Sequence, residues 1–283
     1  MDQSQRVLVA GTGKSGIAAA KLILNRGGEV VLYDGNTALD EKEIKARFEE
    51  GAKVTVVLGE IKRSDLLGVE LCIISPGIPL TSPFVAVVDE ARIPILGEVE
   101  LAYQCSAGKL AAITGTNGKT TTTALTGAMV RKKYEETFVV GTIGEPFTAK
   151  AAEMTEDSAV AEISSFQLET IMDFKPNVSV ILNITPDHLD RHGTMETYTQ
   201  IKECITMNQT EEDTVVLNFD DPILKEFGKK EGLKPKVIWF SSKESLKDGF
   251  FLKGEEIIYA KAGKETVLLN VKELQLLGQH NYE

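Results

Sequence analysis

Six residues, Gly115 to Thr120 (GTNGKT), have the types and the spacing to hold a phosphate group. In a turn between a strand and a helix, glycines let backbone N–H groups approach anionic oxygens at the positive end of the helix. Lys119 adds a positive charge, and the Thr120 hydroxyl suits a magnesium ion bridging the phosphates. The loop is two residues shorter than the usual phosphate-binding pattern. The alternative is a glycine-rich turn whose lysine is solvated.

A second glycine-rich turn, Gly11 to Gly16 (GTGKSG), lies between an apolar run at 7–10 and an alanine-rich helix pattern at 17–24. A further strand pattern, 29–33, ends on Asp34. This is the fingerprint of a Rossmann-type βαβ unit in its proper context. This glycine fingerprint indicates only a tight turn, a close approach of the backbone to phosphate and a helix N-terminus. A dinucleotide and a nucleotide sugar diphosphate both satisfy it, so both remain open.

Polar residues also gather where other strand patterns end. Glu162 closes an apolar run, where it would be a magnesium ligand near the phosphates or, alternatively, a surface glutamate. The stretch from Asp187 to His192 packs two histidines, two aspartates and an arginine after another strand. Taken singly, His192 is better explained as orienting its neighbours or capping a helix. Lys202, judged from the residues alone, is a solvated helix lysine.

The elements that must position these residues form two α/β domains. We expect a Rossmann-like parallel-sheet domain over 1–97 and a P-loop-type ATP-binding central domain over 98–283. In the first domain, a strand at 71–75 runs into the rigid turn Ser75-Pro76-Gly77, at a strand end where α/β folds place ligands. A proline-set loop without a ligand is the alternative there.

The second domain follows a short helix pattern at 98–103 and restarts with a strand that opens onto the phosphate loop. After Asp248-Gly249 the pattern changes to three short apolar runs, which predict a small antiparallel meander. The other predicted strands are 54–58, 159–163, 178–184, 215–217 and 237–240, and the phosphate loop leads into a helix at 120–130.

Composition excludes several classes of protein. The chain has 31 basic and 42 acidic residues, a net charge of −11, which leaves no overall basic field for nucleic acid or an anionic membrane. Three well-separated cysteines form no CxxC pair, which argues against a disulfide framework or a structural zinc site. No apolar run approaches the length of a membrane span. We therefore expect a cytoplasmic, monomeric protein.

Taken together, the motifs identify the chain as similar to the Mur ligase family of peptidoglycan synthesis. The resemblance runs from Val7 to the last residue, through GTGKSG, ISPGIP, ITGTNGKTT, EISSFQLE, ILNITPDHLDRH, LNFDDP and GQHNY. The short phosphate loop is the family's own variant, and EISSFQLE favours the glutamate-adding member. The resemblance implies an ATP-dependent ligase that joins D-glutamate to UDP-N-acetylmuramoyl-L-alanine through an acyl phosphate.

The resemblance also implies roles for individual positions. The substrate set is Lys14, Ser15, Asp34, Gly35, Asn36, Ser75, Pro76, Gly77, Thr142, Ser164 and His188. The ATP set is Gly115, Thr116, Asn117, Gly118, Lys119, Thr120, Thr121, Asn218 and His280, with Asp187 near the nucleotide. The ligands of two magnesium ions are Thr120, Glu162, His188 and Lys202, the last as a carbamylated lysine. The catalytic set is Lys119, Glu162, His188 and Lys202.

Two departures from the family pattern matter. Family members commonly have asparagine where this chain has Thr142, so the contact of that asparagine to the substrate phosphate is weakened, moved to the Thr142 hydroxyl or lost. The family also continues into a third domain that supplies much of the amino-acid site, whereas the sequence ends at Glu283. We expect these residues to bind nucleotides but to ligate D-glutamate poorly or not at all.

Two other classes compete with the ligase. An NAD-linked oxidoreductase would rest on GTGKSG and Asp34, but it leaves the loop at 115–120 unexplained. A non-catalytic nucleotide-binding module would keep both glycine-rich turns without the chemistry.

Overall fold

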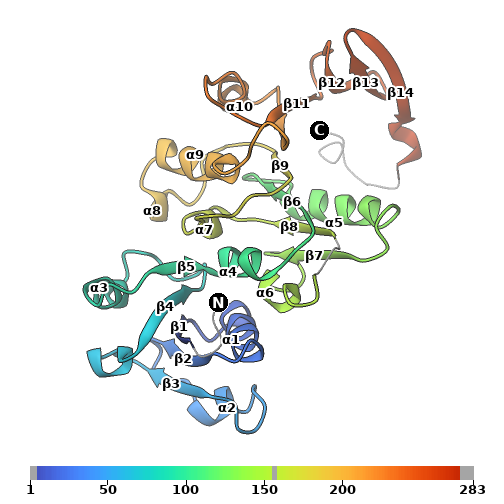
Figure 1. Cartoon of the computed structure of the whole chain (residues 1–283). Helices are drawn as coiled ribbons and strands as arrows, with labels where there is room; N and C mark the ends of the chain where they lie inside the picture. Colours follow the sequence, from blue (N-terminus) through green and yellow to red (C-terminus); the bar gives the residue numbers. More distant parts are fainter. Residues whose placement is uncertain (1–4, 155–157, 275–283) are drawn as a thin grey trace. The chain divides into compact units, whose positions relative to one another are not determined.

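The structure is a computed structural model that describes residues 5–154 and 158–274 (Figure 1). The chain divides into two compact units. The first comprises Met1–Gly108, Val140–Asp157 and Phe166–Phe174, and the second comprises Lys109–Val139, Ser158–Ser165 and Lys175–Glu283. The first unit therefore includes two segments from far along the chain. The expected domain boundary between residues 97 and 98 stays a prediction.

The first unit is built on a five-stranded parallel sheet in the order β3-β2-β1-β4-β5 (Figure 1). Its strands are β1 Arg6–Ala10, β2 Glu29–Asp34, β3 Val54–Leu58, β4 Val69–Ile74 and β5 Ile95–Gly97. β1 and β2 are almost wholly buried, which explains why they read as continuous apolar runs. The strand order reverses between β1 and β4. At such a switch point, ligands bind outside the carboxyl ends of the strands.

The helices of the first unit pack on this sheet and on one another. They are α1 Lys14–Asn25, α2 Glu41–Lys45, α3 Pro83–Glu90, α4 Glu98–Cys105 and α6 Phe147–Lys150, with a 3-10 turn η1 at Arg63–Leu66. Small residues let α1 lie close to the sheet, since Gly16, Ala19 and Ala20 are all buried. α1, α4 and α6 contact each other. α6 belongs to the segment that starts at Val140, so this helix brings a distant part of the chain into the first unit.

The second unit contains a nine-stranded mixed sheet in the order β14-β13-β12-β11-β10-β9-β6-β8-β7. Strands β8, β6, β9, β10 and β11 run parallel, and β12, β13 and β14 form the antiparallel meander that the sequence predicts. The bounds are β6 Lys109–Thr114, β7 Thr137–Gly141, β8 Ser158–Glu162, β9 Val178–Ile181, β10 Thr214–Asn218, β11 Lys236–Ser241, β12 Gly249–Lys253, β13 Glu256–Lys261 and β14 Lys264–Asn270.

Helix α9, Met195–Glu203, shows how the second unit buries polar groups. The Thr194 hydroxyl caps it by accepting a hydrogen bond from the Thr197 amide. Tyr198 and Lys202 are four residues apart, so they lie on one face, and both are buried. The other helices are α5 Lys119–Val130, α8 Leu189–His192 and α10 Pro222–Phe227, the 3-10 turns η2 Cys204–Thr206 and η3 Val271–Glu273, and α7 Ser165–Leu168 between segments. Within the described residues, no helix has the length and apolar character to cross a membrane.

Candidate functional site

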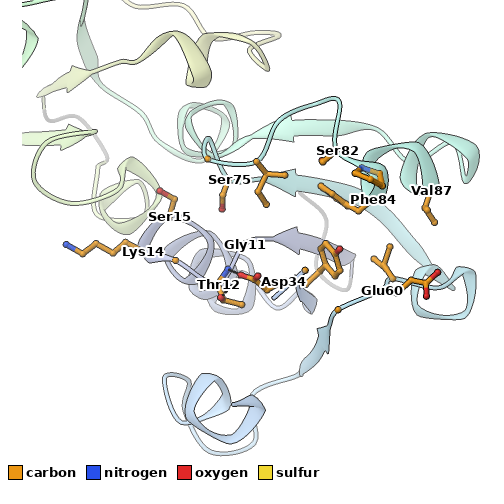
Figure 2. Close-up of a pocket in the computed structure, with 18 residues that line it drawn as sticks. Gly11, Thr12, Lys14, Ser15, Asp34, Glu60, Ser75, Ser82, Phe84 and Val87 are labelled. Carbon is orange, nitrogen blue, oxygen red and sulfur yellow. Dashed lines mark hydrogen bonds between the residues drawn. The ribbon is translucent and has the colours of Figure 1, made fainter. Parts of the chain in front are cut away.

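A cavity of about 750 Å³ lies at the switch point of the first unit (Figure 2). Its lining comes from the ends of β1, β2 and β4 and from the start of α1 and α3. Six of the residues expected to hold the nucleotide sugar line it, namely Lys14, Ser15, Asp34, Gly35, Ser75 and Gly77. Asn36 and Pro76 are not among the lining residues.

Asp34 fixes the shape of the glycine-rich turn. Its carboxylate accepts hydrogen bonds from the amide of Thr12 at 3.0 Å, the hydroxyl of Thr12 at 2.7 Å and the amide of Asn36 at 3.0 Å. Burial raises the pKa of Asp34, but these hydrogen bonds outweigh burial and leave the pKa below its ordinary value. The acid is therefore ionised, and it holds the first turn of the loop in place beside the cavity.

Ser75 brings a hydroxyl close to Gly11, at the start of the same loop. Its amide donates to the Ala10 carbonyl at 3.0 Å, and its buried Oγ has no hydrogen-bond partner among the described residues. A side chain on Gly11, which has φ +102°, would approach Ser75 Oγ within 2.6 Å. Glycine is therefore required at position 11. The Ser75 hydroxyl, which has no partner among the described residues, can hydrogen-bond to a ligand in the cavity.

Apolar side chains form another part of the cavity lining. The rings of Tyr33 and Phe84 lie with their centroids 5.1 Å apart, and Ile61, Ile78 and Val87 line the same cavity. Such a surface accommodates a flat heterocyclic base. Phe84 and Val87 were not predicted from the sequence, although Ser82-Pro83 before an apolar run is a helix-start signal for α3.

The phosphate loop of the second unit joins β6 to α5. Gly118 precedes α5 with φ +82° and Gly115 has φ +153°, conformations that favour glycine. A Cβ on Gly115 would lie 3.0 Å from the Cβ of Leu182. The strand, loop and helix that the sequence predicts are all present. Thr120 and Thr121 are exposed on the first turn of α5.

Lys119 folds back over its own loop. Its ammonium group donates to the carbonyls of Gly115 at 3.1 Å and Thr116 at 2.9 Å. The charge that would meet a phosphate group is thus held within the loop by two backbone carbonyls.

The chain after β9 braces the phosphate loop. Asn183 Oδ1 accepts from the amides of Thr116 at 3.1 Å and Asn117 at 2.8 Å, and Asn183 Nδ2 donates to the Asn117 carbonyl at 3.1 Å. The Thr116 hydroxyl donates to the Thr185 carbonyl and lies 3.1 Å from the Tyr198 hydroxyl. The sequence analysis did not assign Asn183 a role. Its position within the polar stretch after β9 was the available signal.

Lys202 lies under the same loop. Its side chain is 1 % exposed, and its ammonium donates to the Gly115 carbonyl at 2.9 Å and to Thr114 Oγ1 at 3.4 Å. Burial lowers the pKa of Lys202 to about 7, the charge of Lys119 lowers it as well, and Asp187 opposes both. The expectation of a solvated helix lysine, drawn from the residues alone, is wrong. α9 turns this position inward because it buries the same face as Tyr198.

Glu162 lies at the end of β8 and pairs in register with Ile113 of β6, next to the start of the phosphate loop. It is 3 % exposed, so the alternative of a surface glutamate is wrong. His188 is exposed in a left-handed conformation at φ +50°, and its Nε2 lies 3.5 Å from Asp187 Oδ2. Ser164 follows β8 by two residues, and His192 Nε2 lies 3.0 Å from Ser165 Oγ.

Other predicted residues have structural partners or lie beyond the described ranges. Asn218 ends β10, where its amide donates to the Leu182 carbonyl at 3.1 Å. His280 lies outside the described residues. In residues 5–154 and 158–274, no group of three or more His, Cys, Asp or Glu residues is placed to hold a metal ion. The predicted magnesium ligands are not a group of this kind, because two of the four are a threonine hydroxyl and a modified lysine.

Thr142 lies in the first unit, in a tight turn. The Gly141 amide donates to the Glu145 carbonyl at 3.0 Å, and the exposed Thr142 donates from its hydroxyl to Gln167 Oε1 at 3.1 Å. Gln167 is 5 % exposed. The turn and the stretch that follows β8 are therefore joined by side chains within one unit.

Comparisons with known proteins agree with this arrangement. Residues 5–97 match the family described as "Mur ligase MurD-like, N-terminal domain", and residues 113–283 match "Mur ligase middle domain". The chain belongs to the Mur ligase family. Its membership removes the support for an NAD-linked oxidoreductase, since the glycine-rich turn at Gly11 lies within a Mur ligase N-terminal domain.

Curated relatives include two proteins named UDP-N-acetylmuramoylalanine--D-glutamate ligase. The one from Lachnoclostridium phytofermentans is 47 % identical over 99 % of this chain and 61 % of the relative. The one from Caldanaerobacter subterraneus subsp. tengcongensis is 45 % identical over 99 % of this chain and 61 % of the relative. The chain thus spans about 61 % of the length of these relatives.

Two solved structures share the fold. A UDP-N-acetylmuramate:L-alanyl-gamma-D-glutamyl-meso-diaminopimelate ligase from Neisseria meningitides has a TM-score of 0.63 at 16 % identity, covering 99 % of this chain and 90 % of that one. UDP-N-acetylmuramate-alanine ligase MurC from Thermotoga maritima has a TM-score of 0.53 at 22 % identity, covering 98 % and 62 %. The predicted α/β class, a parallel sheet followed by a mixed sheet, is confirmed.

Proposed function

We propose that this chain provides the nucleotide-binding parts of an ATP-dependent ligase that adds D-glutamate to UDP-N-acetylmuramoyl-L-alanine in peptidoglycan synthesis. Relatives that carry this name match the chain over nearly its whole length. The observation in the structure that carries the proposal is the buried amine of Lys202, 2.9 Å from the Gly115 carbonyl of the phosphate loop. We place the reaction in the cytoplasm and expect a monomer.

The cavity of the first unit would hold the UDP part of the substrate. Its apolar lining around Phe84 suits the base, and the ionised Asp34 keeps the amide-rich turn in position. Lys14 and the unpartnered Ser75 hydroxyl provide a charge and a donor for the remaining polar groups. The diphosphate explains the glycine-rich turn without a dinucleotide, because both ligands present the same anionic oxygens.

The loop of the second unit would hold the phosphates of ATP. Lys119 exchanges the carbonyls of Gly115 and Thr116 for phosphate oxygens, which are stronger, charge-assisted acceptors. Thr120, exposed at the start of α5, presents its hydroxyl to a metal ion on those phosphates. Asn183 keeps the loop in shape while Lys119 changes partners.

Lys202 is suited to carbamylation. With a pKa of about 7, a large fraction of its amine is neutral near pH 7, and the lone pair can form an N–C bond to CO2 with release of a proton. The product is an oxygen-donor anion in place of a cation. With Thr120 and Glu162 it gives a set of oxygen ligands that fits magnesium, and His188 would add a nitrogen ligand. Bound magnesium would neutralise charge on the transferring phosphoryl group.

The chemistry follows from these roles. The alanine carboxylate of the substrate attacks the γ-phosphorus of ATP, ADP leaves, and an acyl phosphate forms. The amine of D-glutamate then attacks the acyl carbon, and the amide forms as phosphate leaves with loss of a proton. Carboxylate and γ-phosphate repel each other. The contribution of Lys119 is to stabilise that negative charge while the loop holds the phosphate in line.

Thermal stabilisation of the 283-residue chain tests the substrate assignment. A ligand that binds only the folded state raises the melting temperature. We expect UDP-N-acetylmuramoyl-L-alanine to raise it more than UDP, and NADH to leave it unchanged. A shift with NADH alone, and none with the muramoyl substrate, would contradict the proposal.

A further inference from the structure

Helix α4 buries two acidic residues at its start. Glu98 is 2 % exposed and Glu100 is 0 % exposed, and within the described ranges neither forms an ion pair. Carboxylates are rarely buried to this extent unless their oxygens are satisfied, because removing them from water is costly. Their partners are backbone amides and the Thr148 hydroxyl in segments far along the chain, while Glu98 Oε2 is buried with no hydrogen-bond partner among the described residues.

Glu98 holds the segment that contains α6. Its Oε1 accepts from the Thr148 amide at 2.7 Å and from the Thr148 hydroxyl at 2.6 Å. The residue before α6 is Pro146, whose side chain offers no cap. Burial raises the pKa of Glu98, and the hydrogen bonds from Thr148 and Phe147 oppose it. Glu98 thus supplies from α4 the acceptor that α6 lacks in its own sequence.

Glu100 holds a second segment. Its two oxygens accept from three successive backbone amides, those of Met172, Asp173 and Phe174, at 2.8 to 3.0 Å. Gln104 Nε2 donates to the same carboxylate at 2.8 Å. Residues two apart on a helix point in nearly opposite directions. One helix therefore holds two segments on two of its sides.

The two segments meet again at Thr142 and Gln167, joined by the 3.1 Å hydrogen bond from the Thr142 hydroxyl. Thr142 is six residues before Thr148, and Gln167 is five before Met172. Gly97, just before α4, also donates to the Thr170 carbonyl at 3.3 Å. All of these hydrogen bonds, from Glu98 and Glu100 to the Thr142–Gln167 pair, lie within the first unit, which also contains the cavity.

We propose that Glu98 and Glu100 are positioning residues, which fix the Thr142–Gln167 pair. Thr142 does not line the cavity assigned to the UDP group, so its hydroxyl meets the muramoyl substrate beyond that group and not at the phosphate. The inference rests on the proposed function. Neither glutamate is among the residues that line the cavity of the first unit, and the printed partners of both lie in the protein itself. Both act through backbone amides that place the turn at 141–145.

The test measures dissociation constants of the 283-residue chain by calorimetry, for UDP-N-acetylmuramoyl-L-alanine, UDP and ATP separately. We expect Glu98→Gln and Glu100→Gln each to weaken binding of the muramoyl substrate about tenfold, because a loosened support misplaces the contacting group. UDP and ATP should stay within about twofold of wild type. Thr148→Val, which keeps the amide but removes the hydroxyl, should have a smaller effect in the same direction.

A double-mutant cycle separates positioning from general destabilisation. If Glu98 acts through Thr142, Glu98→Gln should add no further loss in a Thr142→Val background. The matched control is Asp213→Asn, which removes a 3 % exposed carboxylate that accepts from the Thr210 amide and hydroxyl in the second unit. It should leave muramoyl binding unchanged.

Two results would overturn the inference: equal losses for UDP and the muramoyl substrate, or full additivity with Thr142→Val. A wild-type chain that binds the muramoyl substrate no more tightly than UDP would instead overturn the proposed function itself, and the inference with it.

Discussion

The two glycine-rich turns share one local plan but differ in what their polar groups contact. The turn at Gly11 borders an open cavity. Asp34 is hydrogen-bonded to Thr12, and Ser75 Oγ has no partner in the part of the chain that the structure describes. The turn at Gly115 is closed on itself. The Gly115 carbonyl accepts hydrogen bonds from both Lys119 and Lys202. The amides of Thr116 and Asn117 donate to Asn183.

A strand, a glycine-rich loop and a helix therefore do not by themselves determine how a phosphate group is bound. In the first unit the loop borders the cavity, and among the described residues the Ser75 hydroxyl has no hydrogen bond that a ligand would have to displace. In the second unit a ligand must replace the carbonyls that Lys119 already contacts. We therefore expect the second loop to depend more strongly on its charged residue than the first.

The largest expected effect is on ATP binding when that charge is removed. Lys119→Ala should weaken ATP binding on the order of 100-fold, because a charge-assisted hydrogen bond to phosphate is lost. UDP binding should not change. Calorimetry with both nucleotides checks this, with Lys14→Ala as the mirror control, which should weaken UDP binding and spare ATP. Equal losses of UDP and ATP binding in either variant would contradict the assignment of one nucleotide to each loop.

A second prediction concerns Lys202. The folded pKa is about 7 against an ordinary value of 10.5, so the unfolded chain binds more protons between these values and stability should rise as the pH increases from about 7 to about 10.5. Lys202→Met should lack that rise in denaturant unfolding at a series of pH values. With 13C-labelled bicarbonate, wild type should show a carbamate carbonyl signal in NMR that Lys202→Met lacks. Identical spectra would refute carbamylation at this position.

Asp34→Asn should have a smaller effect, confined to the first unit. The amide side chain keeps one acceptor oxygen in place of two and so cannot accept from both the Thr12 and the Asn36 amides in the same way. The turn therefore loosens, and UDP binding should weaken about tenfold while ATP binding stays unchanged. The hydrogen-bonded Asp34 has a lowered pKa, so its stabilisation is present above about pH 4 and is lost as the pH falls through that pKa. Thermal melts of wild type and Asp34→Asn between pH 3 and 6, at roughly equal spacing, measure this loss of stability at low pH. A variant whose melting temperature depends on pH as that of wild type does would contradict a stabilising role for the Asp34 carboxylate.

The smallest effects distinguish the glycines of the two turns. Gly115→Ala should cost about 1–3 kcal/mol in unfolding free energy, since φ is positive and the new Cβ would press on Leu182. Gly13→Ala, with φ −72° and no atom within 4 Å of the new Cβ, should change stability by no more than about 0.5 kcal/mol. Urea titration of both variants measures the difference. A larger loss for Gly13→Ala would show that the loops were ranked wrongly.

Particular elements show how far the sequence reaches. The strand at 54–58 and the meander strands were predictable, because short apolar runs between glycines favour strands even where, as at Val267 and Leu268, the side chains are exposed. Helix α3 and strand β7 were not predicted, although α3 begins with Ser82-Pro83. The strand predicted to extend to residue 184 ends at Ile181, because the following residues leave the sheet to brace the phosphate loop.

The two glycine-rich turns, the strands and helices around them, and the acids and lysines at their ends can be recognised from the sequence, since they depend on residue types a few positions apart. Which polar groups form hydrogen bonds with one another follows from the tertiary fold. Lys202 and Gly115 are 87 residues apart, and Glu100 and Phe174 are 74 apart. Such pairs form because a buried polar group loses its water and must hydrogen-bond to a group from another segment. No local periodicity of the sequence encodes which segment that is.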